Sequence, residues 1–139
     1  MATEIALVTG GCGCIGFSVV KALLQEPSIS KVHVFSRNPS KNLLPGVEYH
    51  AGSLTSEKDI ESVFSVVQPT VLFHIASPIM SGTGSTTANE YYKVNVGGTK
   101  KLLDCANKTG VVKVSDVLRA ETTLRSTDPS LIASLLHGV

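Results

Sequence analysis

A glycine-rich turn constrains the fold of this sequence more than any other feature. Gly11, Gly13 and Gly16 form the pattern G-x-G-x-x-G directly after a short apolar segment, Glu4 to Thr9. Apolar residues at helical spacing follow from Ile15 to Gln25, and Pro27 forbids continuation of that helix. The pattern predicts a strand buried on both faces, a tight turn and an α-helix.

The residue types in this turn suit a ligand with paired phosphates. A pyrophosphate needs backbone N–H donors at close range, and a side chain at Gly13 would block that approach. The helix N-terminus adds about half a positive charge and unpaired N–H groups. Gly16 lets the helix pack close to the strand, and Cys12 and Cys14 contribute backbone N–H groups rather than thiol chemistry. The alternative is a glycine-rich turn that holds no ligand.

Strands and helices alternate over most of the remaining chain. The patterns predict an α/β fold with a parallel sheet of four or five strands in the order 3-2-1-4 and helices on both faces. Further strands are expected at residues 31–36, 47–51 and 70–76. Further helices are expected from a cap at Ser56 to Val67 and from about Ala88 to Lys108, the second closed by Gly110.

The pattern weakens after Val112. Only residues 111–114 are available for a fifth strand, and residues 115–125 and 128–138 show the spacing of two short helices. We therefore divide the chain into a dinucleotide-binding half, residues 1–113, and a divergent, irregular helical tail, residues 114–139. With an incomplete fifth strand the fourth strand would be an exposed edge, which predicts marginal stability or self-association.

The end of the second strand bears on the choice of cofactor. An acid is expected there for the ribose 2′-hydroxyl of NAD, about 20 residues after the glycine turn. This sequence has Ser36 and Arg37 instead. Both can donate hydrogen bonds to a 2′-phosphate, so NADP is favoured over NAD. Alternatively, Arg37 stacks on adenine or lies in solvent.

The composition excludes several other classes of function. Only 17% of residues are charged, the formal net charge is +1 and no basic run is present, so a nucleic-acid partner is not expected. The longest apolar runs have the length of strands, which predicts no membrane segment. No secretory signal is indicated, and we expect a cytoplasmic location. The three cysteines form no metal-ligand pattern, and no metal ligand is predicted.

Four segments together resemble the extended short-chain dehydrogenase/reductase family, and most closely its branch of 3β-hydroxysteroid dehydrogenases and sterol-4α-carboxylate 3-dehydrogenases. The segments are T-G-G-C-G-C-I-G at 9–16, V-F-S-R-N-P at 34–39, L-F-H-I-A-S-P at 72–78 and Y-Y-K-V-N-V-G-G-T at 91–99. The resemblance covers the chain from Glu4 to about Lys113. It implies part of a Rossmann fold.

The resemblance also implies roles for individual residues. Gly10, Gly13 and Gly16 would hold the pyrophosphate, with Ile15 covering it. Ser53 and Leu54 stand where relatives carry an acid that contacts adenine, and Ser53 departs from that pattern. The remaining implied positions are Ala76 and Ser77 along the nicotinamide ribose, and Asn95 supporting the catalytic site. The alternative for Asn95 is a structural amide bonded to a loop carbonyl, and His74 is predicted to be a hydrogen-bonded core histidine rather than a base.

One family feature is absent from the sequence. Relatives use a tyrosine followed four residues later by a lysine, but none of the three tyrosines, Tyr49, Tyr91 and Tyr92, has a lysine at that distance. No catalytic residue is therefore predicted. Three interpretations stay open: a truncated member of an oxidoreductase lineage whose full-length form oxidises a steroid-like 3β-hydroxyl, a non-catalytic nucleotide-binding module, or a defective gene product.

Overall fold

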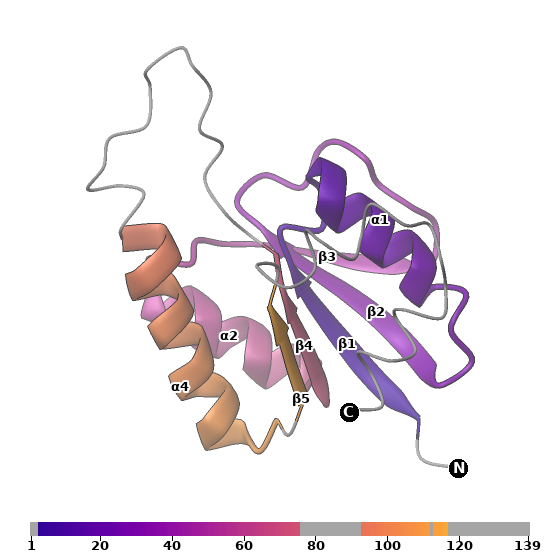
Figure 1. Ribbon diagram of the computed structural model, residues 1–139. Coiled ribbons are helices and arrows are strands. Elements are labelled where there is room, and N and C mark those ends of the chain that lie inside the picture. Colours follow the sequence, from indigo (N-terminus) through magenta and orange to yellow (C-terminus); the bar gives the residue numbers. More distant parts are fainter. Residues whose placement is uncertain (1–2, 76–92, 112, 117–139) are drawn as a thin grey trace.

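The computed structural model describes residues 3–75, 93–111 and 113–116. All five strands form one parallel sheet in the order β3-β2-β1-β4-β5 (Figure 1). This confirms the predicted α/β class and the order 3-2-1-4, and it adds a fifth strand outside β4. The strands are β1 (Glu4–Thr9), β2 (Ile29–Ser36), β3 (Val47–Ala51), β4 (Val71–His74) and β5 (Lys113–Asp116).

Helices cover both faces of the sheet, as predicted. Figure 1 shows α1 (Cys14–Leu23) on one face and α2 (Glu57–Val67) and α4 (Thr99–Thr109) on the other. A π-helical segment, η1 (Lys93–Gly98), leads directly into α4, and Gly110 caps α4 in the left-handed conformation. The expected start of the long helix, residues 88–92, lies outside the described residues.

The central strand β1 is buried on both faces, which explains its unbroken apolar sequence. Ala6 and Val8 face α1, whereas Leu7 faces α2 and α4. Two core layers result, one on each side of the sheet. The α1 side contains Val19, Val20, Leu23, Val32, Val34, Val71 and Phe73; the other side contains Phe35, Leu54, Ile60, Val63, Phe64, Val67, Leu72, Leu102, Cys105 and Ala106.

The expectation that the fourth strand would be an exposed edge is wrong. β5 pairs with β4 in parallel over four positions, from Val71↔Lys113 to His74↔Asp116. Ser115 and Asp116, which were expected in a helix, therefore belong to a strand. The backbone N–H and C=O groups of β4 can hydrogen-bond to a further strand along the whole length of β4. This pairing between distant segments outweighs the weak helical pattern of residues 115 and 116. The premise for self-association through β4 is thereby removed.

The N-terminus of α2 is capped at Ser56, as the sequence predicts. Of the two hydrogen bonds of a capping box, only the one accepted by the Ser56 side chain forms. The Ser56 hydroxyl accepts a hydrogen bond from the Asp59 backbone N–H at 3.2 Å. The Asp59 carboxylate accepts from the backbone N–H of Ser53 at 3.0 Å instead of from Ser56. The carboxylate thus holds the loop after β3 against the first turn of α2.

Among the described helices, none combines the length and the apolar character that a membrane crossing requires.

Candidate nucleotide-binding site

The carboxyl ends of the inner strands meet at one edge of the sheet (Figure 1). Backbone hydrogen bonds continue past the strand ends: Gly10 donates to the Phe35 carbonyl at 3.1 Å, and Ile75 donates to the Thr9 carbonyl at 3.1 Å. Gly52 likewise donates to the Ser36 carbonyl at 3.0 Å. The loops that follow β1, β2, β3 and β4 are therefore held side by side at this edge, where parallel α/β sheets bind their ligands.

The glycine turn links β1 to α1 in the way the sequence predicts. Gly10 adopts a left-handed conformation with φ +73°, and the Gly13 N–H donates back to the Gly10 carbonyl at 3.1 Å. Gly13 is the N-cap of α1; no side chain caps this helix, and its first turn carries no acidic residue. The positive end of α1 thus lies at the ligand-binding edge of the sheet.

The glycines of this turn differ in what the fold demands of them. A Cβ on Gly16 would lie 2.0 Å from the Gly10 carbonyl oxygen, and one on Gly11 would lie 2.7 Å from a methyl group of Val34. A Cβ on Gly13 would meet only the Gly10 oxygen, at 3.4 Å, an ordinary contact. Gly13 is also exposed and has φ −79°, which any residue adopts. Packing therefore explains Gly11 and Gly16, but it does not explain Gly13.

Ser36 lies beside this turn, and Arg37 directly follows Ser36 in the chain. Ser36 is the last residue of β2 and is half-buried, whereas Arg37 is exposed and forms no ion pair with any described residue. Burial raises the pKa of the Cys12 thiol, and a hydrogen bond with the Ser36 side chain partly opposes that rise. The end of β2 therefore contacts the glycine turn directly.

Asn42 is a residue of this region that the sequence analysis missed. Its side-chain amide donates to the Cys12 carbonyl at 2.9 Å, and its backbone is left-handed with φ +55°. This contact fastens the loop after β2 to the glycine turn. Asparagine tolerates the left-handed region better than most residues, but its position within N-P-S-K-N carried no sign of its partner.

The residues expected near adenine follow β3. Ser53 is half-buried; its N–H is bonded to Asp59, and its hydroxyl lies 2.7 Å from the Thr55 hydroxyl. The Leu54 side chain is part of the core, and its Cβ would lie 3.0 Å from a Cβ on Gly98. Gly98 thus packs closely against this loop, while a Cβ on Gly97 would meet no described atom within 4 Å.

His74 is a hydrogen-bonded core histidine, as predicted. Its Nδ1 lies 2.7 Å from the Thr9 hydroxyl, and its Nε2 lies 2.8 Å from the Thr99 hydroxyl. The ring therefore connects the ends of β1 and β4 with the first residue of α4. It stabilises the arrangement of three elements at the same edge of the sheet.

The other predicted positions are described only in part or not at all. Cys14 and Ile15 are the first two residues of α1, and Ile15 is half-buried. Asn95 lies within η1, a type of helical irregularity that is frequent at functional sites. Ala76 and Ser77 lie outside the described residues.

Comparison with known proteins identifies the family of this chain. The model of the NAD dependent epimerase/dehydratase family matches residues 6–122. The chain belongs to this family. The match continues past residue 113, the boundary that we predict between the binding half and the tail.

Curated proteins similar to this chain include steroid and sterol dehydrogenases. The chain is 32% identical over 142 residues to short-chain dehydrogenase/reductase family 42E member 1 of Macaca fascicularis, covering 96% of this chain and 35% of the relative. It is 33% identical over 110 residues to a 3-beta-hydroxysteroid dehydrogenase of Mycolicibacterium neoaurum, covering 76% and 29%. The chain thus spans about a third of the length of the curated relatives it matches.

Solved epimerases of the family share the fold. UDP-glucose 4-epimerase of Thermotoga maritima, solved with UDP-glucose, matches with a TM-score of 0.72 and 30% identity, covering 81% of this chain and 37% of that one. The Thermus thermophilus enzyme, solved with NAD, matches with a TM-score of 0.70 and 27% identity, covering 79% and 36%. These likenesses establish the Rossmann-type arrangement of the sheet and helices.

Proposed function

We propose that this chain binds NADP or NAD through the turn from Gly10 to Gly16, as the cofactor-binding part of an oxidoreductase. The observation that carries the proposal is Gly13: it is exposed and free of strain, and packing against the described residues does not require a glycine there. A ligand that approaches the backbone closely does require one. The uncapped N-terminus of α1 supports an anionic ligand at the same place.

The residues at the sheet edge fit a dinucleotide that extends from this turn. In the proposal the pyrophosphate lies against the backbone of Gly10, Gly13, Cys14 and Gly16, with Ile15 beside it. Ser36 and Arg37 face the adenosine ribose, and the loop of Ser53 and Leu54 lies near adenine, with Leu54 contributing backbone because its side chain is buried. The positions assigned to the nicotinamide side are Ala76, Ser77 and Asn95.

NADP is the preferred cofactor in this proposal. Arg37 is exposed, directly follows Ser36 and has no ion-pair partner among the described residues, so its guanidinium is available to a 2′-phosphate. The hydroxyl of Ser36 can donate to the same group. A carboxylate that would repel the phosphate is absent from both positions.

The proposed reaction is oxidation of a 3β-hydroxyl on a steroid-like substrate. The names of the Mycolicibacterium neoaurum relative and of the yeast sterol-4-alpha-carboxylate 3-dehydrogenase, 29% identical over 116 residues, support this class. The bound nicotinamide would accept the hydride, while this chain binds and orients the cofactor. Because these 139 residues contain no Tyr-x-x-x-Lys, we expect the chain by itself to act as a nucleotide-binding module without turnover. A cytoplasmic location, the tail boundary at 113 and self-association stay predictions.

Calorimetric titration of the 139-residue chain with NADPH and with NADH tests the proposal. We expect both to bind, NADPH more tightly, and we expect Gly13→Ala to weaken both by about tenfold or more, which corresponds to about 1.4 kcal/mol. Gly97→Ala is the matched control, since a Cβ there meets no atom of residues 3–75, 93–111 or 113–116 within 4 Å, and it should bind as the parent chain does. Absence of binding to a folded chain would refute the proposed function, and tighter binding of NADH would refute the preference for NADP.

A further inference from the structure

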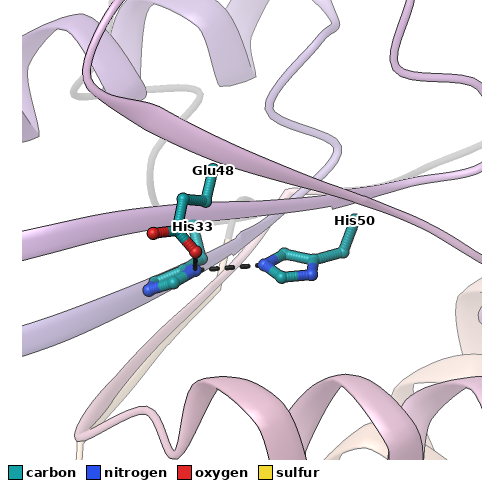
Figure 2. Close-up of side chains that lie close together, drawn as sticks. All are labelled: His33, Glu48 and His50. Carbon is teal, nitrogen blue, oxygen red and sulfur yellow. Dashed lines mark hydrogen bonds and ion pairs between the residues drawn. The ribbon is translucent and has the colours of Figure 1, made fainter.

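Three metal-ligating side chains gather on the β2–β3 pair, away from the glycine turn. His33 lies on β2 and pairs in register with Glu48 on β3, while His50 pairs with Phe35. Residues that pair in a parallel sheet share a face, and so do residues two apart on one strand. His33, Glu48 and His50 therefore project from the same face of the sheet, and Figure 2 shows their side chains turned toward one another.

Two of the distances between their ligand atoms are close to those of a coordination shell. His33 Nδ1 lies 3.0 Å from His50 Nε2 and 3.4 Å from Glu48 Oε2, and one ligand atom from each residue lies within 4.8 Å of the others (Figure 2). Around a tetrahedral zinc ion with bonds of about 2.0–2.1 Å, neighbouring ligand atoms are roughly 3.3–3.4 Å apart. Small side-chain shifts suffice to place an ion between the three atoms.

The chemistry of the ligand set selects the metal. Two imidazole nitrogens and one carboxylate oxygen suit Zn²⁺, whereas Mg²⁺ and Ca²⁺ prefer oxygen ligands alone. Two histidines with one glutamate leave a fourth tetrahedral position for a water molecule. The Glu48 side chain is 66% exposed, so the ion and its water reach the cluster from the solvent side.

Neutral His33 and His50 rings can offer both facing nitrogens to an ion. A neutral imidazole keeps a lone pair on one ring nitrogen. In the ring–ring hydrogen bond one of the facing nitrogens carries the proton; when an ion binds, that proton moves to the other nitrogen of its own ring. Both facing lone pairs then become available without net proton release.

We propose that His33, Glu48 and His50 bind one Zn²⁺ ion that ties the edge strand β3 to β2. Among the described strands β3 pairs only with β2, so an ion bound by both strands adds a cross-link at an edge of the sheet. A ligand that binds only the folded state raises its stability by mass action. The ion would therefore stabilise the fold.

Cobalt titration of the whole chain tests the site. Co²⁺ should give the visible absorption of a tetrahedral nitrogen and oxygen site, and one equivalent of Zn²⁺ should abolish it. Intense near-ultraviolet bands from thiolate ligation should be absent. Zn²⁺ should also raise the Tm, and the chelator EDTA should reverse the rise.

Two variants locate the ion. His50→Gln and Glu48→Gln should each lower the affinity for Co²⁺ by about tenfold or more. Both residues are less buried than His33, which favours retention of the fold. Near-ultraviolet circular dichroism verifies that fold. Glu61→Gln, which removes an exposed carboxylate from α2, is the matched control and should bind as the parent does. Unchanged binding by folded His50→Gln, sulfur ligation, or no binding by the parent chain would each overturn the proposal.

Discussion

The Gly10 carbonyl oxygen occupies the space that a side chain on Gly16 would need, since a Cβ there would lie 2.0 Å from it. The obstacle is backbone, so neither group can rotate away. We expect Gly16→Ala to push the start of α1 away from β1 and to lower the free energy of unfolding by about 1–3 kcal/mol, as overpacking does. Urea denaturation of the variant and the parent measures this difference.

Gly13→Ala separates binding from folding. Its Cβ would make only an ordinary contact of 3.4 Å, so the free energy of unfolding should fall only by the preference of an N-cap for glycine over alanine, about 0.5–1 kcal/mol, and by less than in Gly16→Ala. The same variant should lose dinucleotide affinity. If Gly13→Ala destabilised the fold as much as Gly16→Ala, the glycine at position 13 would be a packing residue and the central argument for a ligand would fail.

The sequence predicted β1 well because burial on both faces leaves an unbroken apolar segment, and Glu4–Thr9 was predicted with the bounds that the structure has. Val47–Ala51 was also predicted with its observed bounds, although no residue of β3 is fully buried. β5 was missed in part because Lys113–Asp116 carries little apolar pattern. Its conformation depends on β4, about 40 residues earlier, and local spacing cannot report such pairing.

In the candidate site, too, some residues were predicted from the sequence and others were missed. The glycine turn was predictable because its residues are consecutive and each has a local reason. The contact from Asn42 to Cys12 and the cluster of His33 with Glu48 and His50 join residues far apart in sequence. They depend on strand register and on the path of one loop, which no motif encodes.

An acid at position 36 should reverse the cofactor preference. Ser36→Asp places a carboxylate where a 2′-phosphate is expected, and repulsion between them should weaken NADPH binding by about tenfold or more. NADH, with a 2′-hydroxyl that can donate to the carboxylate, should bind at least as well as before. Calorimetric titration with both nucleotides measures the ratio. A variant that lost both affinities equally would indicate a general disturbance, and retained NADPH affinity would remove position 36 from the site.

The cap of α2 should contribute measurably to stability. Ser56→Ala removes the hydroxyl that accepts the Asp59 N–H, and loss of such a cap costs about 1 kcal/mol. Ser65→Ala changes an exposed serine within the same helix and should be neutral or slightly stabilising, because alanine has the higher helix propensity. Thermal or urea unfolding compares the two variants, and equal stability would argue against the capping bond.

The thiol of Cys105 should resist alkylation in the folded chain. Burial raises its pKa above the usual 9.0; the acidic residues Glu61 and Glu57 add to the rise, and Lys108 opposes it. Since the thiolate is the reactive species, its population below pH 9.0 is smaller in the folded state than in the unfolded chain. Iodoacetamide labelling followed by mass spectrometry of the peptide between Lys101 and Lys108 measures the rate with and without urea. Equal rates would show that Cys105 is not protected.

Thr9→Val tests the hydrogen bonds that join β1, β4 and α4. Valine matches threonine in shape but removes the hydroxyl 2.7 Å from His74 Nδ1. The Ile75 N–H keeps its bond to the Thr9 carbonyl, so the loss falls mainly on the buried ring. We expect a destabilisation of about 1–3 kcal/mol, as for loss of a buried hydrogen-bond partner.

Thr70→Val is the matched control. The Thr70 hydroxyl accepts a hydrogen bond from the Ile5 N–H at 2.8 Å but is exposed, so water can replace it and the loss of stability should be smaller. Equal losses in the two variants would mean that the buried hydroxyl of Thr9 contributes no more to stability than the exposed one of Thr70.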